Sequence, residues 1–380
     1  MKILHIADTH LGFSAYRKTT LDGINQREID IYNAFEQFIS YAINTKPDII
    51  IHAGDLFDNV RPNNRAITFA LNQLVKLTKN KIPIVIISGN HEHPKIVETG
   101  HIFSIFDHLE NVYPIYNSKY ERIPFKIQDK ELLIHAIPQC NSKKEYNSEL
   151  KKLLPDKTAD YNIFVSHGSV TGVKQFTMNE FNELIIPTKI FSRDFDYIAL
   201  GHFHKYTKLA KNAFYAGATE NLTFADANEK KGFIEITFSE NSLKQSFIEI
   251  NTRPMIDAKP IKCTGLKIEE VMKKIKQKVK EIKPEKKTFR ITLDDIPTNV
   301  YRSIDFSEIR KLTNNVVHYE LKANFKDKDN DKKSSLSSRI DPLINEFKKY
   351  IDSQNIDEKE MIQELGISYI EKIQSREEGK

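Results

Sequence analysis

Short apolar runs that lead into polar residues recur along the first half of the chain. The clearest is residues 49–51, three consecutive isoleucines followed closely by Gly54 and Asp55. An apolar run of this length predicts a strand buried on both faces. Four other runs have a similar form and are also expected to be strands: 3–7, 84–87, 163–166 and 197–200.

Apolar residues at helical spacing separate the first of these runs. Residues 27–44 and 67–77 both have apolar side chains at intervals of three and four residues. Strand, helix, strand, helix and strand in succession predict a parallel sheet. Residues 206–250 are expected to form β-hairpins on the second face of a two-sheet sandwich. The predicted fold class is α/β: a two-sheet α/β sandwich core, a small α+β domain and a C-terminal helical pair.

The polar pattern divides the chain into four expected parts. A first domain covers residues 1–252, and an α+β domain with a lysine-rich amphipathic helix covers 253–325. Residues 326–338 are rich in charge and serine and have no apolar periodicity, which predicts a flexible linker. Residues 339–380 begin with an Asp-Pro helix-start signal and then show helical spacing, which predicts a helical segment.

Composition limits which cellular compartment and which class of partner are expected. The hydrophobic fraction of 39% over 380 residues supports a substantial core. A net charge of +5 is mildly basic, which is consistent with nucleic acid but does not establish it. Two cysteines are too few for a disulfide framework or a thiolate zinc site, which favours a reducing cytoplasm. With no long apolar run, neither a secreted nor a membrane-bound phosphatase is expected.

Residue types that bind metals stand at the ends of the five predicted strands. Ligands bind at the carboxyl ends of strands in open α/β sheets, so these side chains are expected to converge. Carboxylate, amide and imidazole ligands without thiolate favour Mn²⁺ or a similar divalent ion over structural zinc. The pattern predicts a dinuclear metal site in which Asp55 bridges the two ions. The residues of these types at the strand ends are Asp8, His10, Asp55, Asn90, His91, His167, His202 and His204.

The order D-x-H, G-D, G-N-H, H, G-H-x-H resembles that of the calcineurin-like metallophosphoesterases. Residues 6–12 and 52–57 look more narrowly like the SbcD-type nucleases of double-strand-break repair, the meiotic recombination eleven family. The likeness is strong over roughly the first 250 residues. It implies two Mn²⁺ ions per chain, one held by Asp8, His10, Asp55 and His204, the other by Asp55, Asn90, His167 and His202.

The resemblance also implies a chemistry. A hydroxide shared by the two ions attacks phosphorus in line, and His91 stabilises the transition state and helps to protonate the leaving oxygen. Asp58 departs from the pattern, since many family members have histidine three residues after the bridging aspartate. The segment Gly54–Asp58 resembles the generic phosphatase motif GDxxD instead. This departure leaves open whether a second histidine assists the phosphate. It also leaves open the balance of exonuclease and endonuclease activity.

The activity implied is a Mn-dependent DNA nuclease, with single-strand endonuclease and 3'-5' double-strand exonuclease activity, that processes double-strand breaks with an SMC-like ATPase. It would act in the cytoplasm, associated with the nucleoid. Two alternatives remain open: a small-molecule phosphodiesterase or phosphatase using the same site, and a non-catalytic scaffold that bridges DNA ends. The family forms homodimers through helices of the first domain, for which residues 67–77 and 102–109 are the candidates here.

Two further sets of contact residues are predicted. Basic and polar loop residues near the strand ends are candidates for gripping DNA phosphates, with solvated charged loops as the alternative. They are Tyr16, Arg17, Lys18, Arg61, Asn63, Asn64, Arg65 and Lys174. An apolar stripe in the tail is expected to dock on the coiled-coil root of an SbcC-type ABC ATPase, with folding back on its own chain as the alternative. It includes Leu343, Ile344, Phe347, Ile351, Met361 and Leu365.

Overall fold

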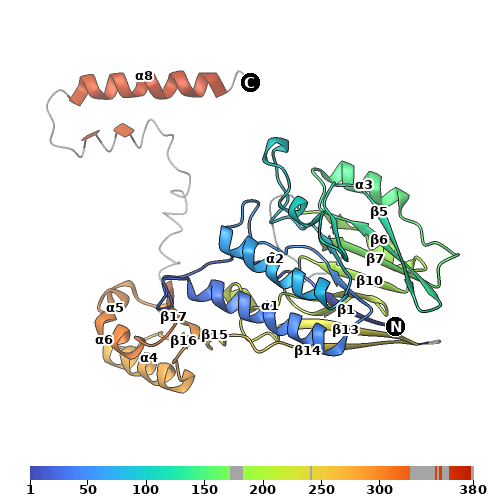
Figure 1. The fold of residues 1–380 in the computed structure, drawn as a ribbon. Helices are drawn as coiled ribbons and strands as arrows, with labels where there is room; N and C mark the ends of the chain where they lie inside the picture. The colour runs from blue at the N-terminus through green and yellow to red at the C-terminus, as the bar shows by residue number, and fades with distance from the viewer. Residues whose placement is uncertain (172–182, 240–241, 326–346, 349–350, 353–358, 378–380) are drawn as a thin grey trace. The chain divides into compact units, whose positions relative to one another are not determined.

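The computed structural model describes residues 1–171, 183–239, 242–325, 347–348, 351–352 and 359–377 (Figure 1). It divides into two compact units. Unit 1 comprises Met1–Lys259, Lys276–Ile291 and Ser307–Glu320; unit 2 comprises Pro260–Ile275, Thr292–Phe306 and Leu321–Lys380. The boundary at residue 252 stays a prediction. The expected linker at 326–338 and the residues Lys174, Leu343 and Ile344 lie outside the described residues.

The first six-stranded sheet lies beneath two helices in unit 1. Its strands in spatial order are β14 (Ser242–Glu249), β13 (Gly232–Ser239), β1 (Lys2–Ile6), β2 (Ile49–His52), β3 (Ile84–Ile87) and β4 (Val112–Ile115). β1, β2 and β3 are parallel, with Ile3 opposite Ile49 and Ile50 opposite Ile84. Helices α1 (Gln26–Thr45) and α2 (Asn64–Lys79) lie side by side along one face (Figure 1).

The second six-stranded sheet supplies the other half of the sandwich. Its order is β11 (Thr207–Lys208), β12 (Ala213–Tyr215), β10 (Tyr197–Gly201), β7 (Tyr161–His167), β6 (Lys130–Ile137) and β5 (Glu121–Ile127). Successive strand residues point to opposite faces. Leu4 and Ile50 therefore pack with Phe35 of α1, whereas Ile51 packs with Val165 of the second sheet. The predicted α/β sandwich is confirmed.

One expectation about the strands is wrong. The hairpin β13–β14 does not join the second sheet: β13 pairs antiparallel with β1, placing His5 opposite Ile234. Within the predicted stretch 206–250, only β11 and β12 join the second sheet. The reason is that β1 has an unpaired edge in the first sheet, which β13 satisfies. Strand pairing of this kind is not encoded in apolar periodicity.

The remaining elements are short or belong to the appended region. Helix α3 (Lys143–Lys152) packs Tyr146 and Leu150 against Phe164 of β7. The other short elements are β8 (Ser169–Val170), β9 (Ile185–Ile186), η1 (Val97–Thr99), η2 (Ile102–Phe106), η3 (Thr188–Ser192) and η4 (Phe224–Asp226). The appended elements are β15 (Met255–Asp257), β16 (Ile261–Lys262), α4 (Ile268–Ile282), β17 (Thr288–Ile296), α5 (Thr298–Arg302), α6 (Phe306–Leu312) and β18 (His318–Phe325). These elements provide the predicted α+β region.

The tail contains helix α8 (Lys359–Glu377) and helical residues at 347–348 and 351–352. The two parts are in contact, because the Gln363 amide donates to the Asp352 carboxylate at 2.6 Å. Ile351 is buried, whereas Met361 and Leu365 are both 59% exposed. No helix in the part of the chain that the structure describes combines the length and the apolar character needed to cross a membrane.

Candidate dinuclear metal centre

The carboxyl ends of five parallel strands meet between the two sheets of unit 1. β1 leads to Asp8 and His10, β2 to Asp55, and β3 to Asn90. In the second sheet, β7 ends at His167 and β10 leads into His202 and His204. All seven predicted ligand residues therefore lie at one edge of the sandwich. Their role as ligands is taken up below as a proposal.

Asp55 lies at the centre of this arrangement. Its Oδ2 atom is 3.1 Å from His167 Nε2 and 3.9 Å from His10 Nε2. Asp55 belongs to two of the three clusters of carboxylate and imidazole atoms in the described residues. These two clusters are Asp55–His167–His202 and His10–Asp55–His91. One carboxylate oxygen therefore faces histidines on both sides.

The first side of Asp55 has an amide and two imidazoles. The Asn90 Oδ1 atom is 3.0 Å from His167 Nε2 and 3.1 Å from His202 Nδ1. The rings of His167 and His202 are 5.2 Å apart and nearly perpendicular. Ligand atoms of Asp55, His167 and His202 lie within 4.8 Å of one another, and the Asn90 oxygen is close to both imidazoles.

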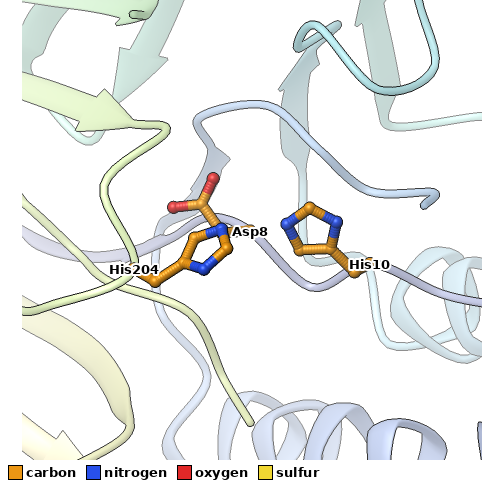
Figure 2. A group of neighbouring side chains, drawn as sticks. All are labelled: Asp8, His10 and His204. Atoms are coloured by element: carbon orange, nitrogen blue, oxygen red, sulfur yellow. The ribbon is translucent and has the colours of Figure 1, made fainter. Parts of the chain in front are cut away.

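The other side has Asp8, His10 and His204, whose ligand atoms all lie within 4.8 Å of one another (Figure 2). The rings of His10 and His204 are 5.1 Å apart. Asp8 is fixed because its Oδ1 atom accepts the backbone N–H of His202 at 2.8 Å. That hydrogen bond also ties the loop after β1 to the loop after β10.

The backbone of the centre is strained. Four candidate ligands have φ in the left-handed region: Asp8 at 52°, His10 at 47°, Asp55 at 55° and His202 at 104°. Non-glycine residues seldom adopt such angles, each costing on the order of 1–3 kcal/mol, and they cluster at functional sites. The strain is independent support for a functional role of this edge.

Two glycines allow the loops to approach closely. A Cβ at Gly89 would lie 2.1 Å from Asp55 Oδ1, and one at Gly54 would lie 2.3 Å from the His167 ring. Gly54 also has φ of 98°, which a side chain would resist. Any larger residue at these positions would displace Asp55 or His167.

His91 borders the centre but has a different environment from the seven ligand candidates. Its ring is 30% exposed, and its Nδ1 atom lies 3.0 Å from the Asp58 carbonyl oxygen. Its backbone N–H donates to Asp55 Oδ1 at 3.0 Å. The ring therefore lies in the cluster with His10 and Asp55, 4.6 Å from the His10 ring, and is partly open to solvent.

Each ligand histidine has an acceptor near its outer ring nitrogen. Such acceptors orient a metal-binding imidazole and set its tautomer. The pairs are His10 Nδ1 with Asp58 Oδ1 at 3.2 Å, His167 Nδ1 with Ala53 O at 2.8 Å, His202 Nε2 with Glu183 Oε1 at 3.3 Å and His204 Nδ1 with Asp226 Oδ1 at 3.7 Å. The inner nitrogens are thereby turned toward the shared carboxylate and amide oxygens.

The charges of the side chains at the centre fit this picture. Burial opposes ionisation of Asp55, but His167 holds the pKa of Asp55 well below its usual value. In the same pair, burial is outweighed by Asp55, which raises the pKa of His167 to about 10. The pair thus favours a carboxylate facing a protonated imidazole, and a bound cation would take the place of that proton's charge. Burial, reinforced by Asp55, raises the pKa of Glu92 to about 8.

The donor set suits a pair of divalent ions. Asp8 Oδ2 and both ring nitrogens of His10 are buried and have no hydrogen-bond partner among the described residues, although Asp58 Oδ1 lies 3.2 Å from His10 Nδ1. Orphaned buried atoms of this kind are rare unless an ion or another group satisfies them. With oxygen and imidazole nitrogen donors and no thiolate, the residues fit two divalent ions.

Several residues of the centre were not predicted from the sequence. No catalytic motif includes Glu183, Asp226 or Lys231. Glu92 follows Asn90 and His91 directly, but it was not predicted to belong to the centre. Asp226 does have a local signal, because Thr223 and Asp226 form a capping box around η4. Nothing in the sequence near Glu183 links it to His202.

The predicted DNA-contact residues have varied surroundings. Arg17, Lys18 and Arg61 are exposed, and the Tyr16 ring stacks on His318 with 3.8 Å between the ring centroids. Asn63 caps α2 by accepting the Ala66 N–H, and Asn64 is the first residue of that helix. Arg65 donates to both carboxylate oxygens of Glu28. Contact with DNA stays a prediction for all of them.

Comparison with known proteins agrees with the geometry. The family model for calcineurin-like phosphoesterases matches residues 1–206. The DNA double-strand break repair protein Mre11 of Methanococcus maripaludis is 30% identical over 329 residues, covering 82% of each chain. The proteins of that name from Saccharolobus solfataricus and Sulfolobus acidocaldarius are 31% and 28% identical, covering 71% and 85% of this chain and 70% and 82% of theirs. The resemblance is confirmed: the chain belongs to the Mre11 family of double-strand-break repair nucleases, within the calcineurin-like metallophosphoesterases.

Proposed function

We propose that this chain is a Mn²⁺-dependent nuclease that acts on DNA ends as a single-strand endonuclease and a 3'-5' double-strand exonuclease. The observation that supports it best is the position of Asp55 Oδ2, which faces His10 on one side and His167 on the other. One ion is held by Asp8, His10, Asp55 and His204. The second is held by Asp55, Asn90, His167 and His202.

Bound ions of this kind polarise the phosphodiester and generate a hydroxide nucleophile near neutral pH. The protein's own part is to hold the ligands and to supply a proton. His91 stands at the solvent side of the centre, anchored through its backbone to Asp55. From there its ring stabilises the charge on the reacting phosphate and protonates the leaving oxygen.

The proposal includes DNA contacts on the loop after β1. A pocket of about 490 Å³ is lined by Tyr16, Arg17 and Lys18 on one side and by Thr313 and residues 316–319 on the other. Both cationic side chains are exposed, so they can reach phosphates without breaking an internal ion pair. Arg61 extends this surface. Arg65 extends it as well if its hydrogen bonds to Glu28 are broken.

We further propose that the tail docks on an SMC-like ATPase of the SbcC type. Met361, Leu365 and Tyr369 are each about 60% exposed and follow one another at four-residue intervals on α8. Such spacing places them on one helix face. An apolar helical stripe of this kind is a recognised mode of docking into a groove. A homodimer through α2 or residues 102–109, acting in the cytoplasm at the nucleoid, belongs to the same proposal.

One experiment separates the proposal from its alternatives. Linear duplex DNA and a chromogenic phosphodiester are offered to the full chain with and without Mn²⁺. We expect Mn²⁺-dependent shortening of the duplex that is faster than hydrolysis of the small ester. Hydrolysis of the small ester alone would favour a small-molecule phosphodiesterase, and binding of DNA without any cleavage would favour a scaffold.

A further inference from the structure

Lys231 is a fully buried lysine that the proposed reaction does not use. Its ammonium group donates to Asp226 Oδ1 at 2.9 Å and to the backbone carbonyl oxygen of His204 at 2.8 Å. Burying an ammonium group costs several kcal/mol, which only well-placed partners offset. Lys231 is therefore held at a definite place, directly behind a proposed metal ligand.

Asp226 is fixed from the opposite direction. Its Oδ2 atom accepts the backbone N–H groups of Thr223 at 2.9 Å and Leu222 at 3.2 Å, at the start of η4. Its Oδ1 atom faces the outer nitrogen of His204, with 3.7 Å between them. One carboxylate thus joins the turn at η4, the buried lysine and the imidazole.

The pair contacts His204 at two places. Lys231 holds its backbone carbonyl, and Asp226 faces its ring. The side chains of Lys231 and Asp226 are 0% and 7% exposed, whereas those of Asp58 and Glu183, the corresponding carboxylates beside His10 and His202, are 19% and 18% exposed. Water competes least with the contacts around His204. A carboxylate behind a ligating histidine raises its basicity and fixes its orientation.

We propose that the Lys231–Asp226 ion pair is a positioning device for His204. It holds the ring so that its inner nitrogen points toward Asp8 and His10, and so sets the affinity of the ion at that cluster. The inference rests on the metal centre proposed above. It assigns a function to two residues outside the ligand set.

The test is a Mn²⁺ titration of the full chain by calorimetry, with Lys231→Met as the main variant. A change in a group behind a ligand typically weakens metal binding by roughly 10- to 100-fold. We expect that loss at one of two sites, the same site that His204→Ala removes, and a change of less than about threefold at the other. Lys230→Met is the matched control. Lys230 is the residue before Lys231, and its substitution breaks only an exposed ion pair with Glu249.

The outcomes are distinct. A folded Lys231→Met chain that binds both ions as the wild type does would overturn the inference alone, and so would an equal loss at both sites. If Lys231→Met does not fold, Asp226→Asn, which keeps an acceptor oxygen toward His204, is measured in the same way. Should neither variant fold, the pair supports folding and not the metal, and the inference fails. A wild-type chain that binds no pair of ions overturns the metal centre itself.

Discussion

The outer nitrogens of the four candidate ligand histidines face one of two kinds of oxygen, a carboxylate or a backbone carbonyl. His10, His202 and His204 face carboxylates, whereas His167 faces the backbone carbonyl of Ala53. His167 instead has the closest contact with the central carboxylate of Asp55. Single residues therefore have separable roles, and substitutions that spare the ligands test them.

His91→Ser should keep both ions but lose turnover. General acid catalysis typically contributes a factor of about 10²–10⁴, so we expect kcat on duplex DNA in Mn²⁺ to fall at least 100-fold. Metal and DNA affinities should stay within about twofold, because His91 acts on the transition state. Asn147→Ser, at an exposed position of α3, is the control. An unchanged kcat for His91→Ser would refute the role.

Buried histidines should make the protein sensitive to acid. Burial lowers the pKa of His5 to about 3, and the unfolded value is 6.5. Below pH 6.5 the unfolded chain binds the additional proton, so stability is lost as pH falls from 6.5 toward 3, by up to about 1.4 kcal/mol per pH unit. Urea unfolding at pH 7 and pH 5 should show a smaller loss for His5→Gln than for wild type. Equal losses in the two proteins would contradict this explanation.

The convergence of the seven candidate ligand residues at one edge was predictable, because each lies at or shortly after the end of a strand whose apolar run is plain in the sequence. The groups facing their outer nitrogens were not, because Glu183 and Asp226 lie outside the strands and only the folded chain brings them to the histidines after β10. Lys231 illustrates the limit further. A lysine in a charged stretch suggests a solvated surface, and its complete burial follows from tertiary contacts alone.

At the scale of elements, apolar periodicity predicted whether a segment is a helix or a strand better than it predicted which strands pair. Helix α1 was expected over residues 27–44 and spans Gln26–Thr45, because its buried face repeats every three to four residues. The hairpin β13–β14 was assigned to the wrong sheet. Alternating residues specify which face of a strand is buried, whereas the choice of neighbouring strand depends on long-range pairing.

The loop after β1 should contribute to DNA affinity through charge. Replacing Arg17 and Lys18 with glutamine should reduce the slope of log K against log salt by about 2, since each phosphate contact contributes about 0.9. Fluorescence anisotropy with a labelled duplex at several salt concentrations measures this slope. The pair Lys151→Gln and Lys152→Gln at the end of α3 is the control. If the slope does not change in the loop variant, these side chains are only solvated.

Helix α8 should bind its partner through its exposed stripe. Met361→Ser with Leu365→Ser removes two apolar side chains, each contributing about 1.5–3 kcal/mol if fully buried on docking. We expect affinity for the SMC-like ATPase to fall at least 100-fold, with nuclease activity in Mn²⁺ unchanged. Glu364→Ser on the same helix is the control. Undiminished ATPase binding by the double variant would show that the stripe is not the dock.

For the whole molecule, the arrangement of the two sheets explains how candidate ligands from both sheets reach one centre. β1, β2 and β3 bring Asp8, Asp55 and Asn90 from the first sheet, and β7 and β10 bring the histidines from the second. Under the proposed assignment, neither sheet alone has a complete ligand set for either ion. The centre therefore depends on the sandwich, and the sandwich packs strained loops at this edge.

The central claim is that Asp55 holds both ions. Calorimetric titration of the full chain with Mn²⁺ tests it directly. We predict two ions per wild-type chain, and neither ion bound by Asp55→Ala, with circular dichroism showing that the variant remains folded. An Asp55→Ala chain that still binds two Mn²⁺ ions with wild-type affinity would contradict a centre built around a shared carboxylate.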